Sequence, residues 1–426
     1  MFPSKPLAIR PFRNLWLGQA ISQFGDAFYY VIFMFMVKKI SGSTTMVGVV
    51  GAAETMPYLL FSAYAGVLAD RLDRRRLMLV SDLASGAFLG LFGVLVYFVP
   101  TPPAWTMVLT PFALSSARVF FMPAKSAAIP ALVPENLLMA ANALSSITQS
   151  MAPMIGLALS MSILGALYSL SQAWFFLVAI IVNLASFLIS AAYVRMLPAV
   201  APVRVEEKQH TFTEFRTGLA YLVRHRVLRV YLVVQTMVSF MIAPFFVAYV
   251  EANNRWLGGT PQGLCGMELT FFVGLVISSG LIPRFKHRRP GLGFAFAVFI
   301  VGACVAAMGY CRTVFLFCVL NIVCGLVLPF CDVPLATYIQ MEVEDGLRGR
   351  VNSVINMLKM GVMPLGMLIG GAIVEEAGPT DGFLVMGIGM AVAALIALAS
   401  PSFRNAEIRE AVAPIIAESS FKLASN

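Results

Sequence analysis

Long apolar segments recur along the whole chain, and they constrain its fold more than any other feature. A helix needs about 20 mostly apolar residues to cross the hydrocarbon core of a bilayer. Backbone groups find no water there, so helices and closed barrels are the structures that cross it. Turn and charge signals divide the apolar sequence into twelve segments, which predicts an all-α membrane protein. The predicted spans are 12–37, 45–69, 77–99, 104–124, 138–167, 173–196, 227–250, 265–283, 292–310, 313–338, 351–374 and 382–402.

The composition agrees with a chain that lies in a membrane. Of the 426 residues, 59% are hydrophobic and only 12% are charged, whereas a soluble domain carries about 25% charged residues. The first apolar segment is too long for a signal-peptide core and has no small-residue cleavage site, so we expect it to be retained.

Several kinds of site have no support in the sequence. The six cysteines form no CxxC pair and lie mostly in apolar runs, which favours small buried hydrophobic residues over disulfides or metal ligands. The three histidines lie in basic loops without metal-ligand spacing, and no GxxxxGK[ST] loop is present to bind ATP. We therefore predict that the protein is not an enzyme and that it has no cofactor and no metal site.

The basic residues predict an orientation. With a cytoplasmic N-terminus, 24 Lys and Arg residues lie in cytoplasmic segments, whereas Lys38, Lys39, Arg255 and Arg312 lie on the other side. This bias follows the positive-inside rule and supports the number of spans, because one missed helix would scramble it. We expect both termini to be cytoplasmic, in a bacterial inner membrane. The net charge of +9 then needs no nucleic acid to explain it.

The two halves of the chain match each other at an offset of about 210 residues. Pro123 pairs with Pro334, and Pro153 pairs with Pro364. Parallel repeats of six spans are typical of transporters whose site lies at the repeat interface, so we predict two pseudo-symmetric six-helix bundles. The expected parts are an N-terminal bundle (1–196), a cytoplasmic linker (197–226), a C-terminal bundle (227–405) and a cytoplasmic tail (406–426).

The linker is predicted to contain an amphipathic helix. Thr211-Phe-Thr-Glu214 has the pattern of a capping box. Phe212, Phe215, Leu219 and Leu222 follow at helical spacing. This helix either packs on the bundle as a simple connection or serves a regulatory role.

Charged residues within the predicted spans are the main candidates for a functional site. Each costs roughly 2.5–3.5 kcal/mol on insertion scales, so each needs a reason to be there. Asp82 and Glu268 lie nearer to span ends and are weaker candidates. The stronger candidates are Asp26, Glu54, Arg118, Asp332 and Lys359.

Each of these five has a functional and a structural interpretation. A carboxylate at Asp26 is suited to proton uptake and release, or forms a structural hydrogen bond with a neighbouring helix. Glu54, among small residues, is suited to bind a cationic substrate or a proton. Arg118 pairs with a carboxylate or binds an anionic group. Asp332 and Lys359 either pair across the tenth and eleventh spans or contact substrate.

The charged segment between the second and third spans resembles a known signature. Residues Gly66-Val-Leu-Ala-Asp-Arg-Leu-Asp-Arg-Arg75 are similar to the pattern G-x-x-x-D-R-x-G-R-[RK] of the major facilitator superfamily. Asp73 replaces the usual glycine, as in the branch that includes the enterobactin exporter and macrolide efflux proteins. Segments 12–26, 118–130 and 215–229 also resemble that branch.

The resemblance implies a cytoplasmic latch formed by Gly66, Asp70, Arg71, Arg74 and Arg75. In the family, the carboxylate that corresponds to Asp70 faces the N-terminus of the eleventh helix when the cytoplasmic side is closed. A carboxylate near a helix start is favoured by roughly 0.3–1 kcal/mol at surface sites. We expect the eleventh helix to begin near Asn352 or Ser353. The alternative is that the segment only anchors the loop among lipid headgroups.

A second segment resembles part of the antiporter signature G-P-x-x-G-G. It reads Ala152-Pro-Met-Ile-Gly-Leu157. The resemblance implies a kinked, closely packed helix at Pro153 and Gly156, with Pro364 as the counterpart in the second half.

These observations predict a monomeric secondary active transporter that exports small amphipathic organic molecules, either drugs or siderophore-like compounds. We expect alternating access in the lipid bilayer, with protons or another ion moving in the opposite direction. The alternative within transport is uptake, or lysophospholipid flipping by the same fold. Against an intramembrane enzyme, the spans contain no nucleophile–base motif, and against a receptor, the sequence has no sizeable soluble domain. The internal repeat fits alternating access, which needs two comparable halves, whereas a channel would leak substrate down its gradient without saturation.

Overall fold

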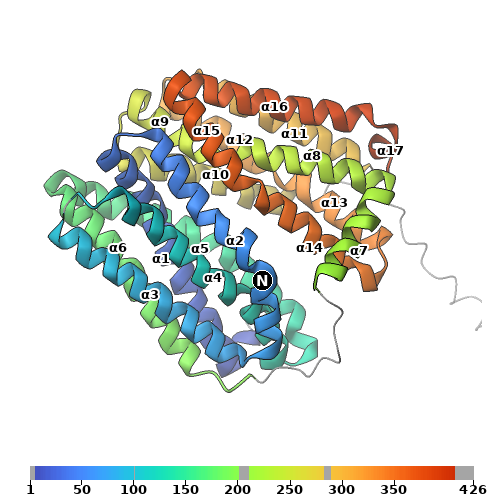
Figure 1. Ribbon diagram of the computed structural model, residues 1–426, viewed down its shortest axis with the longest axis horizontal. Coiled ribbons are helices and arrows are strands. Elements are labelled where there is room, and N and C mark those ends of the chain that lie inside the picture. The colour runs from blue at the N-terminus through green and yellow to red at the C-terminus, as the bar shows by residue number, and fades with distance from the viewer. Residues whose placement is uncertain (1–4, 100, 201–210, 283–288, 408–426) are drawn as a thin grey trace, which may run out of the picture.

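The computed structural model describes residues 5–99, 101–200, 211–282 and 289–407, which contain helices and no strand (Figure 1). The first half contains η1 (Lys5–Ala8), α1 (Arg10–Ser41), α2 (Thr44–Arg71), α3 (Arg74–Phe98), α4 (Ala104–Leu132), α5 (Glu135–Leu170) and α6 (Gln172–Arg195). The linker contains α7 (Thr211–Arg224). The second half contains α8 (Arg226–Ile242), α9 (Phe245–Trp256), α10 (Pro261–Leu281), α11 (Pro290–Met308), α12 (Val314–Val327), α13 (Pro329–Glu342), α14 (Asp345–Gly361), α15 (Met363–Ala377), α16 (Pro379–Ala399) and α17 (Pro401–Arg404).

Every predicted span lies on one helix or on two consecutive helices. Among the described residues, ten stretches are long and apolar enough to cross a membrane. The other two predicted spans, 45–69 and 138–167, lie in α2 and α5, which have 28 and 36 residues. The prediction of an all-α membrane protein is therefore confirmed.

Three predicted spans of the second half are each divided into two helices by a proline. The breaks fall before Pro329 and Pro364 and at Pro244. Proline has no N–H to donate, and its ring clashes with the preceding turn, so the regular helix is interrupted there. Pro153, by contrast, lies inside the continuous helix α5. The two halves therefore differ in backbone structure at the paired positions Pro153 and Pro364.

A short capped turn joins α1 to α2. Gly42 has a φ of 69°, in the left-handed region that favours glycine, and its N–H donates to the carbonyl of Lys38 at 2.9 Å. The Ser43 hydroxyl accepts a hydrogen bond from the Met46 N–H at 3.2 Å and so caps α2. These local signals fix where the chain reverses its direction.

The helices of the two halves form two groups that lie side by side (Figure 1). Within the first group, α1 packs against α6 and α2 against α4, and within the second, α11 packs against α16 and α10 against α12. The groups meet where α2 packs on α15 and where α5 packs on α10. We call the end of the molecule that carries the α1–α2 turn the turn end, and the end that carries the α2–α3 connection the linker end.

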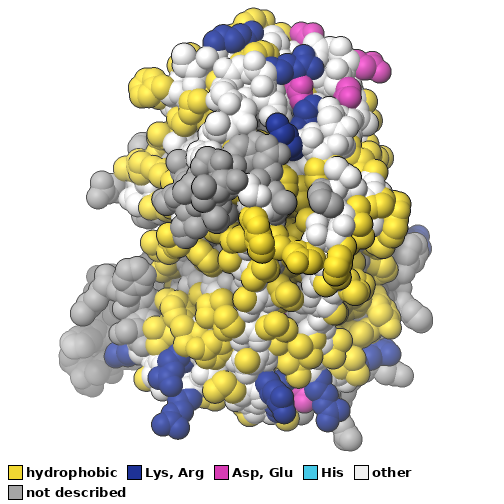
Figure 2. Space-filling model, turned by 90° about the vertical axis from the view of Figure 1, so that its left-hand side faces the viewer, with side chains coloured by type: hydrophobic (Ala, Val, Ile, Leu, Met, Phe, Trp, Pro, Cys, Tyr) yellow, Lys and Arg dark blue, Asp and Glu magenta, His cyan; other side chains and the backbone are white. Residues whose placement is uncertain are grey.

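The molecular surface suits a lipid environment. Figure 2 shows hydrophobic side chains across the middle of one face, with Lys and Arg side chains at its upper and lower edges. Large apolar side chains stand out from the helices, including Leu91, Phe98 and Phe315 at 69%, 74% and 78% exposure. Soluble monomers rarely expose apolar patches of this extent, whereas a bilayer covers them.

The linker helix α7 packs on the second half. A Cβ added at Gly218 would lie 2.7 Å from the carbonyl oxygen of Arg350 on α14, so the two backbones approach closely. Leu222 is completely buried. A helix lies where the sequence predicts it, and its contacts are those of a packed connection. The predicted capping box falls on side chains 211–214, which lie outside the described residues.

Close backbone contact at Gly48 holds the two halves together near the turn end. A Cβ added at Gly48 on α2 would lie 2.6 Å from the carbonyl oxygen of Met367 and 3.2 Å from the Cα of Gly371, both on α15. Small residues permit such an approach between helices in lipid, where van der Waals packing drives association.

We therefore expect Gly48→Leu to lower the melting temperature of the purified protein by several degrees, because the backbone of α15 cannot move aside at low cost. The control is Gly66→Ala on the same helix, where an added Cβ meets nothing within 4 Å. This control should match or exceed the melting temperature of the parent, since Ala favours helix over Gly by about 1 kcal/mol. Equal melting temperatures for the two variants would contradict the proposed contact.

Candidate functional site

A cavity of about 480 Å³ lies among the helices of the first half, with α10 of the second half along one side, and it falls within the usual size range of small-molecule sites. Residues of α1 supply the largest share of its wall, and α10 contributes Glu268 and Phe272 from the second half. The charged residues that line it are Asp26, Glu54, Asp82, Arg118 and Glu268. Its apolar wall includes Val31, Phe33, Leu114, Phe121, Met122, Leu157, Phe187 and Phe272.

Asp26 and Arg118 form an ion pair at this cavity. Arg118 Nη2 lies 2.6 Å from Asp26 Oδ2, and the two side chains are 34% and 22% exposed. Asn183 Nδ2 donates a longer hydrogen bond of 3.5 Å to Asp26 Oδ1. The three residues belong to α1, α4 and α6. The pair therefore links α1 to α4 and balances the charge of Arg118, and Asn183 adds a contact from α6.

The other cavity carboxylates have different surroundings. Asp82 on α3 is only 4% exposed and accepts a hydrogen bond of 2.7 Å from the Ser190 hydroxyl. Glu54 on α2 and Glu268 on α10 have no salt bridge to another described residue. Asp82 and Glu268 are weak candidates by sequence, because they lie near span ends. The structure places both at the cavity, since the rotation of a helix and not depth alone decides what its side chains face.

Asp332 and Lys359 lie apart from this cavity. Lys359 Nζ is 3.7 Å from Asp332 Oδ1, with side-chain exposures of 32% and 48%. Neither residue is among the described residues that line the cavity. The five intramembrane charges predicted by sequence thus divide into three at the cavity and a separate pair that joins α13 to α14.

The arginines of the predicted latch bind carbonyl groups of the first half. Arg74 is 6% exposed, and its Nη1 donates to the carbonyl of Ala127 at 3.1 Å. Arg75 Nη2 donates to the carbonyl of Arg195 at 2.6 Å. These contacts tie the start of α3 to α4 and α6, and so they hold the linker end of the first half together.

Asp73 has a clear local role. Its Oδ1 accepts hydrogen bonds from the N–H groups of Arg75 at 2.9 Å and Arg76 at 3.4 Å, so it caps α3. The residue that departs from the superfamily pattern is therefore the N-cap of the helix that follows.

The other latch residues lie at the end of α2. A Cβ added at Gly66 would meet nothing within 4 Å, and Arg71 is exposed. The side chain of Asp70 lies outside the described residues, so its role stays a prediction. The expected start of the eleventh span near Asn352 is wrong, because α14 begins at Asp345. Hydropathy marks where a helix enters the apolar region, whereas the backbone here becomes helical earlier.

The three predicted kink residues lie in different settings. Pro153 lines the cavity from within α5, and Pro364 follows the break between α14 and α15. A Cβ added at Gly156 would lie 2.8 Å from the carbonyl oxygen of Phe24, so Gly156 allows α5 to approach α1.

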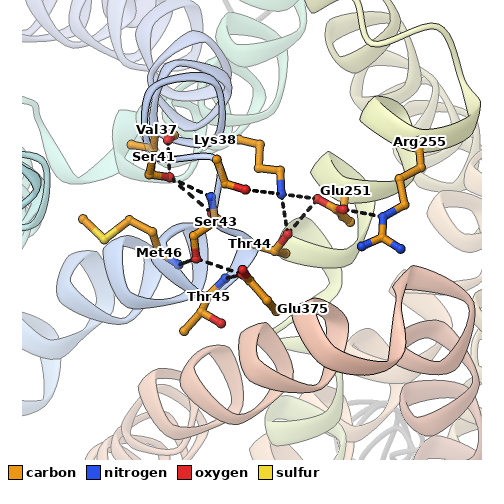
Figure 3. Close-up of polar contacts among 11 residues, drawn as sticks. Val37, Lys38, Ser41, Ser43, Thr44, Thr45, Met46, Glu251, Arg255 and Glu375 are labelled. Carbon is orange, nitrogen blue, oxygen red and sulfur yellow. Dashed lines mark hydrogen bonds and ion pairs between the residues drawn. The ribbon is translucent and has the colours of Figure 1, made fainter. Parts of the chain in front are cut away.

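A polar cluster joins the two halves at the turn end (Figure 3). Glu251 on α9 lies at its centre. Its Oε2 is 2.5 Å from Lys38 Nζ and accepts a hydrogen bond of 2.7 Å from the Thr44 hydroxyl. Its Oε1 is 2.5 Å from Arg255 Nε. One carboxylate of the second half thus holds a cation from each half.

A second carboxylate reinforces this contact. Glu375 Oε2 on α15 accepts hydrogen bonds from the Ser43 hydroxyl at 2.8 Å and the Thr45 N–H at 2.5 Å (Figure 3). We call these residues the turn-end cluster: Lys38, Ser43, Thr44, Thr45, Glu251, Arg255 and Glu375. The sequence marks Lys38 and Arg255 as basic residues on the less basic side, but it does not indicate that they share a partner.

Solved structures show the class of fold. The chain superposes on the nucleoside transporter NupG with a TM-score of 0.69 at 14% identity, over 92% of this chain and 100% of the other. It superposes on the E. coli fucose:proton symporter FucP with a TM-score of 0.58 at 15% identity, over 92% and 98%. The chain therefore has the same fold as these two membrane transporters.

Sequence comparison gives the family. Residues 2–417 match the family of transmembrane secretion effectors, and the chain belongs to that family. It is 25% identical over 380 residues to macrolide efflux protein A of Streptococcus pyogenes, which covers 88% of this chain and 92% of the relative. It is 24% identical over 397 residues to the multidrug efflux pump Tap of Mycobacterium tuberculosis (strain ATCC 25618 / H37Rv), over 90% and 92%. The resemblance to efflux transporters is confirmed, and the protein is a transporter and not an enzyme.

The Asp26–Arg118 pair makes a testable prediction about stability. Arg118→Leu or Asp26→Asn alone leaves a charge without its partner, so each should lower the melting temperature. The double variant should be more stable than the sum of the single losses implies, with a coupling of about 0.5–3 kcal/mol. Thermal unfolding of the four purified proteins measures this coupling. Additive effects would show that the two side chains do not stabilise each other.

Proposed function

We propose that this protein exports small amphipathic organic molecules by alternating access and that inward proton movement drives the export. The observation that carries the proposal is a cavity of the first half that α10 of the second half also lines, with carboxylates within an otherwise apolar protein. Kinship with macrolide and multidrug efflux proteins supports the direction and the kind of substrate.

The proposal includes a specific topology. The chain crosses the bilayer twelve times in two six-helix bundles, with α2 and α5 as spans beside the ten apolar stretches. The linker end is cytoplasmic, because the loops at residues 71–76 and 195–226 carry many of the basic residues. The protein acts as a monomer in the cytoplasmic membrane of a bacterium.

Asp26 and Glu54 are the proposed proton carriers. Both line the cavity, where the charged form of a carboxylate depends on its neighbours and on water. Arg118 favours the charged form of Asp26 through the ion pair of 2.6 Å. When Asp26 takes up a proton, the ion pair would break and Arg118 could pair with another group. Protonation of Asp26 would in this way change the contacts between helices.

The turn-end cluster supports alternating access. It closes the turn end through contacts between the halves, and these contacts must separate before the cavity can open to that side. The proposed latch at Asp70 would act at the linker end and favour the opposite state. Transport then needs each closure to be strong enough to form and weak enough to release.

Lysophospholipid flipping and uptake remain the second candidate function. A phosphate would need a free cation at the cavity, and Arg118 is already matched by Asp26. This observation favours export of an organic molecule over movement of a phosphate headgroup.

Proton coupling predicts that everted membrane vesicles with an acidic interior accumulate a radiolabelled macrolide, and that collapse of the pH gradient stops this. Asp26→Asn and Glu54→Gln should each reduce the accumulation about tenfold or more. Glu376→Gln, at an exposed position outside the cavity, is the matched control. If the macrolide accumulates to the same level with and without a pH gradient, export is not coupled to protons.

The turn-end cluster predicts a shift in conformation. Spin labels at Lys39→Cys and Glu376→Cys, both exposed, report the distance across the turn end after replacement of the six native cysteines. Glu251→Gln should add a population with a longer distance, because Lys38 loses its charged partner.

Two further variants calibrate that measurement. Asp381→Asn, an exposed acid at the same end, should leave the distance unchanged. Asp70→Asn should keep the turn end closed and reduce transport, because the proposed latch favours the opposite state. A distance in Glu251→Gln that equals the distance in Asp381→Asn would show that the cluster does not hold the turn end shut.

A further inference from the structure

The cavity carries more negative than positive charge. Four carboxylates line it, and Arg118 is the cation among its described lining residues. Arg118 is matched by Asp26 at 2.6 Å, and Asp82 accepts a hydrogen bond from a serine hydroxyl. Glu54 and Glu268 form no salt bridge with another described residue. Two carboxylates are thus left to meet whatever enters the cavity.

These two carboxylates lie on opposite sides of the contact between the halves. Glu54 comes from α2 in the first half, and Glu268 comes from α10 in the second. Tyr30 lines the same cavity, so a ligand that fills the cavity can meet Tyr30 and carboxylates from both halves.

Tyr29 supplies an unsatisfied polar group at the same place. Its side chain is 6% exposed and lines the cavity. Its hydroxyl is buried and has no hydrogen-bond partner among the described residues. Buried polar groups without partners are rare and unfavourable, so this hydroxyl is expected to find one when the cavity is occupied.

The surrounding wall is aromatic. Tyr29 and Phe33 both line the cavity, and their ring centroids are 5.1 Å apart. Phe272 lines the cavity one turn along α10 from Glu268. Aromatic faces attract organic cations and also cover their hydrocarbon parts.

We propose that the cavity binds amphipathic organic cations, with the cationic group between Glu54 and Glu268 and the apolar part against the aromatic wall. This inference rests on the proposed function as an exporter and narrows its substrates. Anionic siderophore-like molecules are excluded, because the cavity offers them two unmatched carboxylates and one arginine that is already paired. Lys125 does not change this balance, since it lines a separate small void beside Gln19.

Two hydrophobic ions of matched shape test the charge preference without any variant. Tetraphenylphosphonium is a cation and tetraphenylborate is an anion of closely similar size. We expect displaceable, saturable binding of radiolabelled tetraphenylphosphonium to the purified full-length protein in detergent. Tetraphenylborate should bind at least tenfold more weakly. Equal binding of the two ions, tighter binding of the anion, or displaceable binding of neither would overturn the inference.

Variants then locate the site. Glu268→Gln and Glu54→Gln should each weaken tetraphenylphosphonium binding roughly tenfold, since each removes one charged partner of the cation. Glu376→Gln, an exposed acid of the second half outside the cavity, should bind as the parent does. Unchanged binding in Glu268→Gln would overturn the role of the second-half carboxylate. A melting temperature close to that of the parent shows that each variant is folded.

Failure of this inference can be told apart from failure of the proposed function. Proton-driven export without preference for cations would overturn this inference and leave the exporter intact. Preference for the cation without proton-driven transport would uphold the binding site and overturn the proposed coupling.

Discussion

The hydrocarbon core of a bilayer offers no hydrogen bonds to a peptide group, and the rest of this structure depends on that constraint. It makes the described chain helical, and it also controls the polar side chains inside. Asp26 has Arg118 and Asp82 has Ser190, so each of these carboxylates has a partner supplied by the protein. The Tyr29 hydroxyl, by contrast, has no hydrogen-bond partner among the described residues and belongs to a side chain that lines the cavity. The polar side chains of the cavity therefore differ in whether the protein itself supplies their partner.

The same constraint explains how much the sequence could predict. Helices have to satisfy their own backbone in lipid, so hydropathy alone indicates where the long helices of the described chain lie. Charged residues in lipid are costly, so the sequence alone marks Asp26, Glu54 and Arg118 as candidates. Asp332 and Lys359 satisfy the same criterion and yet form a pair away from the cavity. The cost of a charge indicates that it has a partner, but not whether the partner is protein or ligand.

What the sequence could not supply is helix rotation and contact between distant segments. Glu268 faces the cavity because of the way α10 is rotated against α5. Lys38 and Glu251 are more than 200 positions apart, and no local pattern connects them. The internal repeat is also a poor guide to such detail. Pro153 and Pro364 correspond in sequence, but α5 is continuous whereas the second-half span is divided.

Glu251, Lys38 and Arg255 form a group of three charges, and the loss of Lys38 differs in its consequence from the loss of Glu251. Lys38 and Arg255 sit on the two oxygens of one carboxylate, so two like charges are held close together by the acid between them. Loss of Lys38 would leave a neutral pair of Glu251 and Arg255 within the second half. Loss of the acid would leave two cations facing each other, so the electrostatic attraction between Lys38 and the second half would become repulsion. A single position outside the cavity can thus reverse the sign of this one interaction between the halves, while the groups that line the cavity stay as they are.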